Sequence, residues 1–191
     1  MRFNETTLPA ALLAGTLGGI AGTAAMAACG AVWSAADSSN GRGAQSRRLR
    51  RSGVGKRQFP QSEPRSHEDP DTPSQFLARH LPGVTTRQQE RVIGSLIHFA
   101  FGAAAGATYA ALLATAPPPV TRVLQSGRGL TYGVLVWLLA DEIGVPLAGI
   151  APSPHRTPPR LHAYALAGHL AYGLALEATR SATAPPPASR P

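Results

Sequence analysis

The stretch GLTYGVLVWLLADEIGVPLAGIA, Gly129–Ala151, decides the fold class of this chain. It is 23 residues long, and its only charged side chains are the adjacent carboxylates Asp141 and Glu142. A bilayer core of about 30 Å is crossed by about 20 apolar residues in a helix, so the stretch is long enough to span a membrane. A soluble protein would turn both carboxylates into water, whereas charge inside a membrane is costly and usually functional.

Three other stretches are nearly free of charge. No Lys, Arg, Asp or Glu occurs over the 31 residues 6–36 or the 30 residues 92–121, and a shorter run covers residues 161–176. The mean hydropathy of −0.04 hides this pattern, because 11 of the 18 Lys and Arg residues fall within residues 42–91. We therefore predict an all-α, multi-pass membrane protein with four transmembrane helices.

The four spans divide the chain into segments. Residues 1–36 hold the first span, residues 92–180 hold the other three, and residues 181–191 form a disordered tail. Residues 37–91 are predicted to be a basic, mostly disordered loop, because they offer little apolar surface to offset the entropy of ordering. Within this loop DTPSQFLARHLPG, residues 71–83, predicts a short amphipathic helix that lies on the membrane surface.

The distribution of basic residues predicts orientation and partners. Thirteen of the 18 Lys and Arg residues lie in the loops between the first and second and between the third and fourth spans. This asymmetry places the long loop in the cytoplasm and both termini outside a bacterial inner membrane. We expect no nucleic-acid partner, because no aromatic interleaving or binding fold accompanies the basic cluster. The expected partners of that cluster are anionic lipid headgroups of the bilayer, contacted by Arg47, Arg48, Arg50, Arg51, Lys56 and Arg57.

Glycines spaced four residues apart predict close helix packing. Small residues at this spacing allow the backbones of membrane helices to approach each other. We expect these faces to serve packing within the bundle, and also contact with a second copy or with another membrane protein. The glycines concerned are Gly15, Gly19, Gly102, Gly106, Gly129 and Gly133.

Four ionisable residues from three predicted spans are expected to form one polar layer in the cytoplasmic half of the membrane. They are Asp141, Glu142, His98 and His169, which helix geometry places at similar depths, about 10–15 Å from the cytoplasmic end. Asp141 shares a stripe with Gly133 and is expected to meet His98 or His169, whereas Glu142 points toward leucines. Three interpretations remain open: an interhelical hydrogen-bonded contact, a proton or ion path, and a metal site.

Catalytic and cofactor motifs are not evident in the sequence. We find no HExxH, nucleophile elbow, P-loop or CxxC, so we expect neither an enzyme nor a cofactor or bound metal. The single cysteine, Cys29, excludes an intrachain disulfide.

Several motifs resemble the YagU-like group of uncharacterised bacterial inner-membrane proteins. They are GGIAGTAAM (18–26), EDPD (68–71), IHFAFGAAAGATYA (97–110), YGVLVWLLADEIGVPLAGI (132–150) and HAYALAGHLAYGL (162–174). The resemblance implies a multi-pass membrane protein of unestablished activity, and the namesake's link to acid resistance fits an Asp/His layer. We therefore expect a structural or accessory protein in acid or envelope homeostasis. The alternative is a proton-coupled channel or transporter that uses the polar layer.

Overall fold

A computed structural model describes residues 7–51, 72–150 and 153–183, with side chains described from residue 8 to 39 in the first range. Every regular element in this part of the chain is helical, which confirms the all-α prediction. The elements are α1 (Thr7–Arg51), α2 (Pro73–Arg79), α3 (Arg87–Thr115), α4 (Pro118–Gln125), α5 (Leu130–Val136), the π-helix η1 (Trp137–Gly144), α6 (Val145–Leu147), the 3-10 helix η2 (Pro154–Arg156) and α7 (Pro159–Thr183).

Three helical stretches in the described residues are long and apolar enough to cross a membrane: Leu8–Ser39, Arg87–Thr115 and Leu130–Leu147. They belong to α1, to α3 and to the continuous run α5–η1–α6. The chain is therefore a candidate multi-pass membrane protein. The fourth expected span corresponds to α7, which does not meet the same criterion, so the four-span arrangement stays a prediction.

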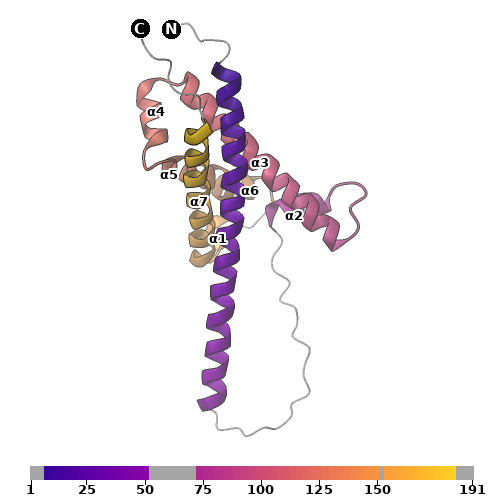
Figure 1. Ribbon diagram of the computed structural model, residues 1–191. Coiled ribbons are helices and arrows are strands. Elements are labelled where there is room, and N and C mark those ends of the chain that lie inside the picture. Colours follow the sequence, from indigo (N-terminus) through magenta and orange to yellow (C-terminus); the bar gives the residue numbers. More distant parts are fainter. Residues whose placement is uncertain (1–6, 52–71, 151–152, 184–191) are drawn as a thin grey trace.

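α1 is the central helix of the bundle, and α3 packs along one side of it (Figure 1). Gly15 of α1 meets the backbone of Gly106, and Gly19 meets the backbone of Gly102. Contacts at rising numbers on α1 thus pair with falling numbers on α3, so the two helices are antiparallel. A Cβ atom at any of these four positions would collide with the facing helix, which explains why glycine is required there.

α7 packs along another side of α1, also antiparallel. Gly18 lies against Leu176 near one end of the contact, and Gly30 lies against the Tyr164 hydroxyl near the other. α5 in turn packs antiparallel on α7, because Gly129 meets Gly173. The bundle therefore contains α1 and α5 running one way and α3 and α7 running the other.

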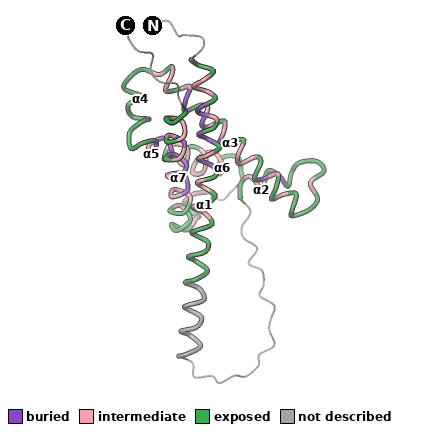
Figure 2. The backbone as a smooth tube through the Cα atoms, in the orientation of Figure 1, coloured by how far each residue is buried: buried purple, intermediate pink, exposed green. Residues whose placement is uncertain are grey.

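Tyrosine side chains fill the core between these helices. Tyr109, Tyr132 and Tyr172 are buried, and the rings of Tyr109 and Tyr132 lie 4.6 Å apart. The Tyr172 hydroxyl donates to the carbonyl of Gly102 at 2.8 Å, and the Tyr132 hydroxyl donates to the carbonyl of Ala105 at 2.7 Å. A buried phenol without a partner would be costly, so these bonds let polar rings occupy an apolar core. Outside this core most of the described residues are exposed or half-buried (Figure 2).

Two helix starts follow the local sequence signals. The Thr72 side chain accepts from the backbone N–H of Gln75, and the side-chain oxygen of Gln75 accepts from the backbone N–H of Thr72. α2 begins directly after this capping box. The same reciprocal pair, Thr86 and Gln89, starts α3. Each box satisfies backbone donors that the first helical turn leaves free.

α1 continues beyond the end that the sequence predicted near Asp37. The hydroxyl of Ser38 donates to the carbonyl of Ser34, and that of Ser39 donates to the carbonyl of Ala36. Both serines thus bond back into the helix, although they lie in the segment that is predicted to be a mostly disordered loop. The side chains of the basic cluster lie outside the described ones, so its contact with lipid headgroups stays a prediction.

Candidate functional site

A π-helix positions the two carboxylates of the third apolar stretch. The N–H of Val145 bonds to the carbonyl of Ala140, five residues back, in place of the usual four. The next residue, Pro146, has no N–H, and its ring would clash with the carbonyl four residues earlier in a regular α-helix. The structure has a wider π-turn before this proline, which is a frequent feature of functional sites.

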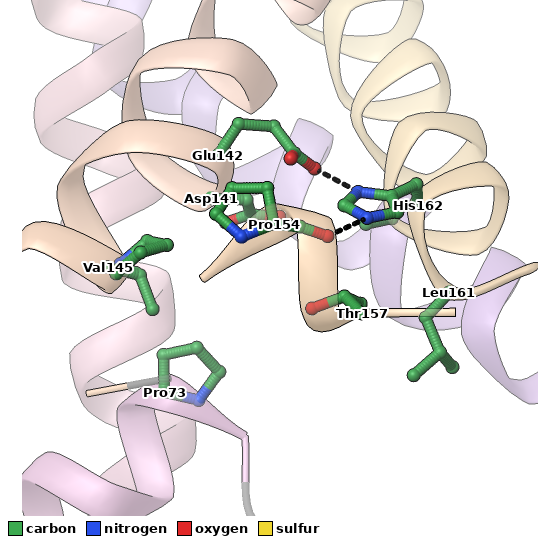
Figure 3. Close-up of a pocket in the computed structure, with 10 residues that line it drawn as sticks. Pro73, Asp141, Glu142, Val145, Pro154, Thr157, Leu161 and His162 are labelled. Carbon is green, nitrogen blue, oxygen red and sulfur yellow. Dashed lines mark hydrogen bonds and ion pairs between the residues drawn. The ribbon is translucent and has the colours of Figure 1, made fainter. Parts of the chain in front are cut away.

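Glu142 forms the shortest side-chain contact between this helix and α7. Its Oε1 lies 2.6 Å from Nδ1 of His162, and Nε2 of the same ring lies 3.0 Å from the carbonyl of Pro154 (Figure 3). The expectation that Glu142 turns toward leucines is therefore wrong. The regular spacing of about 100° per residue, on which that expectation depended, does not hold through a π-helix.

The two bonds of His162 determine how many protons the pair holds. The Pro154 carbonyl can only accept, and an ionised Glu142 carboxylate can only accept as well. For both bonds to exist, either both ring nitrogens carry a proton or the Glu142 carboxyl carries one. Both forms contain the same number of protons. In each of them the charges of Glu142 and His162 sum to zero.

Asp141 faces the other histidine of α7. Its Oδ2 lies 3.7 Å from Nδ1 of His169, and that nitrogen lies 3.0 Å from the carbonyl of Ala165. The distance allows an ion pair when His169 is protonated but is too long for a hydrogen bond. Within the described residues the Asp141 carboxylate has no hydrogen-bond partner, and 33% of its side chain is exposed.

His98 is the third residue of the predicted layer that the structure brings together, after Asp141 and His169. It projects from α3 and lies close enough to His169 for their charges to interact. Asp141, His169 and His98 thus form one group, contributed by three helical segments. Glu142 joins a second group with His162, a residue that the sequence analysis did not select. A signal was available, because His162 and His169 are seven residues apart and so share one face of a helix.

A cavity of about 170 Å³ lies beside the carboxylates. Its walls are contributed by the start of α2, the π-helix, the segment at η2 and the first turns of α7 (Figure 3). The lining residues are Pro73, Asp141, Glu142, Val145, Pro146, Pro154, Thr157, Leu161, His162 and Ala165.

The chemistry available at this place is the exchange of protons and the binding of charge. Across the described ranges, no three His, Cys, Asp or Glu side chains converge as a metal site would require. The carboxylates and histidines instead form pairs that join neighbouring helices, with an apolar cavity against one side of them. The six glycines predicted for packing all lie at contacts inside the bundle.

Comparison with known proteins gives a family for this arrangement. No curated protein and no solved structure matches the chain. Residues 59–178 match a family described as protein of unknown function (DUF1440). The matched region includes α2 to α6, most of α7, both carboxylate–histidine pairs and all residues that line the cavity. The chain belongs to the DUF1440 family.

Proposed function

We propose that this protein is a four-span protein of the bacterial inner membrane with an accessory, non-enzymatic role, in line with its resemblance to the YagU-like group. The observation that carries this proposal is the Glu142–His162 contact of 2.6 Å, which joins the third apolar stretch to α7. A half-buried polar pair between membrane helices helps to fix their register, since each member alone would be poorly solvated. Such a pair suits a protein that holds a defined shape in the membrane during acid or envelope stress.

The contacts of α7 support its role as the fourth span. It lies against α1 from Gly18, opposite Leu176, to Gly30, opposite Tyr164. This part of α1 falls within its own apolar stretch, Leu8–Ser39. A helix packed side by side along that stretch occupies the same depth. Its weaker hydropathy is compensated because α1 and α5 cover much of its surface.

Reporter fusions test the four-span topology. A fusion after Ala36 should report the cytoplasm, and a fusion after Arg180 should report the periplasm, as the asymmetry of basic residues requires. If both fusions report the same side, the chain crosses the membrane an even number of times between them or not at all, and the proposal fails.

A second function, proton-coupled transport, is favoured by one specific observation. Asp141 lies in the cavity wall without a hydrogen bond from the described residues, His169 lies 3.7 Å from it, and His98 is close enough to His169 for their charges to interact. Series of carboxylates and histidines inside membranes often carry protons. The tyrosine core of the bundle is buried, so a path through the bundle would need that core to open.

Proteoliposomes separate the two functions. In a transporter, an imposed pH gradient drives a flux that Asp141→Asn removes. In an accessory protein, the gradient decays at the rate of empty liposomes for both forms. Asp141→Asn keeps the size of the side chain, so the comparison is not confounded by a collapsed cavity.

A further inference from the structure

We propose that the cavity beside the π-helix binds a small organic cation, an alkylammonium group on a short apolar body, which takes the place of a proton on Asp141. This inference goes beyond an accessory role, and it does not require transport. It rests on the size of the cavity, on its apolar walls and on the single carboxylate in it that lacks a hydrogen bond.

The cavity volume limits the size of the ligand. A cavity of about 150 Å³ lined by apolar side chains can hold a benzene molecule. The 170 Å³ found here therefore accommodates about six non-hydrogen atoms. Most of the wall is apolar, with Val145, Leu161, Ala165 and three prolines, so it favours hydrocarbon over a fully hydrated ion.

The carboxylate of Asp141, which lacks a hydrogen bond from the described residues, sets the charge of the ligand. Glu142 and His162 bond to each other and together carry no net charge, so they leave Asp141 as the one group in the wall able to hold a cation. A single carboxylate matches a single positive charge. Hard divalent ions prefer six or more oxygen ligands, which these walls do not offer. An ammonium needs only a few acceptors, and Thr157 and Glu142 contribute to the same wall.

Ligand binding is linked to protonation of Asp141. Removal from water disfavours the charged form of a carboxylate, so in the site that we propose Asp141 holds a proton while the cavity holds no cation. An ammonium supplies the same neutralisation, and the proton then leaves to solvent. The other ionisable groups facing Asp141 are Glu142 from the same helix, His169 and His162 from α7, and His98 from α3 behind His169. From α2, the wall contains only Pro73.

Calorimetric titration of the full-length protein in detergent with n-butylammonium tests the inference, with n-butanol as the neutral analogue. We expect saturable binding of the amine but not of the alcohol. Its Kd should fall by up to tenfold for each unit of pH rise while Asp141 is protonated in the free protein. Titrations in two buffers of different ionisation enthalpy should show release of up to one proton per amine bound.

Two variants and a control locate the site. Asp141→Asn should weaken binding at least tenfold and abolish the proton release. Ala165→Leu fills the cavity and should also prevent binding, although every carboxylate remains. Ala163→Leu, on the exposed face of the same helix, should bind as the wild type does. Retained binding in either Asp141→Asn or Ala165→Leu would overturn the assignment, as would equal binding of n-butanol.

The ammonium group has two natural sources, a free amine and the headgroup of phosphatidylethanolamine. Titration in nanodiscs of phosphatidylglycerol, with and without phosphatidylethanolamine, distinguishes them. Competition from phosphatidylethanolamine assigns the site to lipid, and undiminished binding assigns it to free amines. If n-butylammonium does not bind in either membrane, the inference fails, while the accessory role and the four-span topology are unaffected.

Discussion

Glu142 and Asp141 are neighbours in the sequence, yet their environments differ. Glu142 shares a short hydrogen bond with His162, whereas Asp141 stands 3.7 Å from His169 and next to the cavity. The sequence analysis predicted a contact with a histidine for Asp141 and contacts with leucines for Glu142. The geometry gives the structural role to Glu142 and leaves Asp141 available to exchange its proton, so the two carboxylates should respond differently to substitution.

Replacement of each carboxylate by alanine tests this division. Glu142→Ala should lower the Tm in detergent more than Asp141→Ala does, because only the former breaks a short hydrogen bond and leaves His162 without one partner. A double-mutant cycle should show strong coupling between Glu142 and His162, and weaker coupling between Asp141 and His169. Additive effects at Glu142 and His162 would show that the contact contributes nothing to stability.

Gly102 is the tightest point of the α1–α3 contact. A Cβ atom there would collide with the Thr23 hydroxyl and approach the Gly19 carbonyl. Overpacking of this kind costs about 1–3 kcal/mol. We therefore expect Gly102→Ala to lower the free energy of unfolding by about this amount, measured by denaturation in mixed micelles. Ala104→Val, at an exposed position of the same helix, is the control and should change little.

At the scale of elements, the π-helix is the feature on which the site depends. It inserts one extra residue per turn before Pro146, and both carboxylates thereby reach α7. Pro146→Ala restores the missing N–H, which allows regular α-helical bonding through this turn. We expect the helix to become straighter and Glu142 to rotate away from His162.

The coupling energy between Glu142 and His162 reports this rotation. In the Pro146→Ala background, the double-mutant coupling should decrease relative to the wild type, although proline-to-alanine changes in helices ordinarily increase stability. Unchanged coupling would mean that the π-helix does not depend on Pro146. Pro82→Ala, in the turn after α2, is a control that removes a proline elsewhere.

Local signals in the sequence predicted much of the fold. The capping boxes at Thr72 and Thr86 place the starts of α2 and α3, and the glycine spacing marks the faces that pack. The expected contact of Asp141 with a histidine agrees with the structure, whereas the direction predicted for Glu142 was wrong, because the shifted hydrogen bonds of η1 change the direction in which its side chains point. The sequence analysis did not predict the short helix α4, which begins with Pro118 and Pro119, although proline is well tolerated in a first helical turn.

At the scale of the whole molecule, the family match and the packing unit do not coincide. The DUF1440 region covers residues 59–178 and omits α1. Yet α1 supplies the surface against which both α3 and α7 bury their small-residue faces. Because the glycines at these contacts are already used inside the bundle, they are not free to join a second copy. A homo-oligomer would therefore need another surface, such as the exposed apolar side chains of α3.

Separation of α1 from the rest tests whether the bundle is one folding unit. A fragment of residues 59–191 expressed alone should aggregate in detergent, because α3 and α7 would expose the faces that Gly102 and Gly168 help to form. Co-expression of residues 1–58 as a second fragment should restore a soluble complex, since membrane helices insert independently and then associate by packing. Gly19→Leu in the short fragment should prevent this rescue, whereas Leu13→Ile, on its exposed face, should not. If the long fragment is monodisperse by itself, α1 is an addition to a self-sufficient DUF1440 bundle.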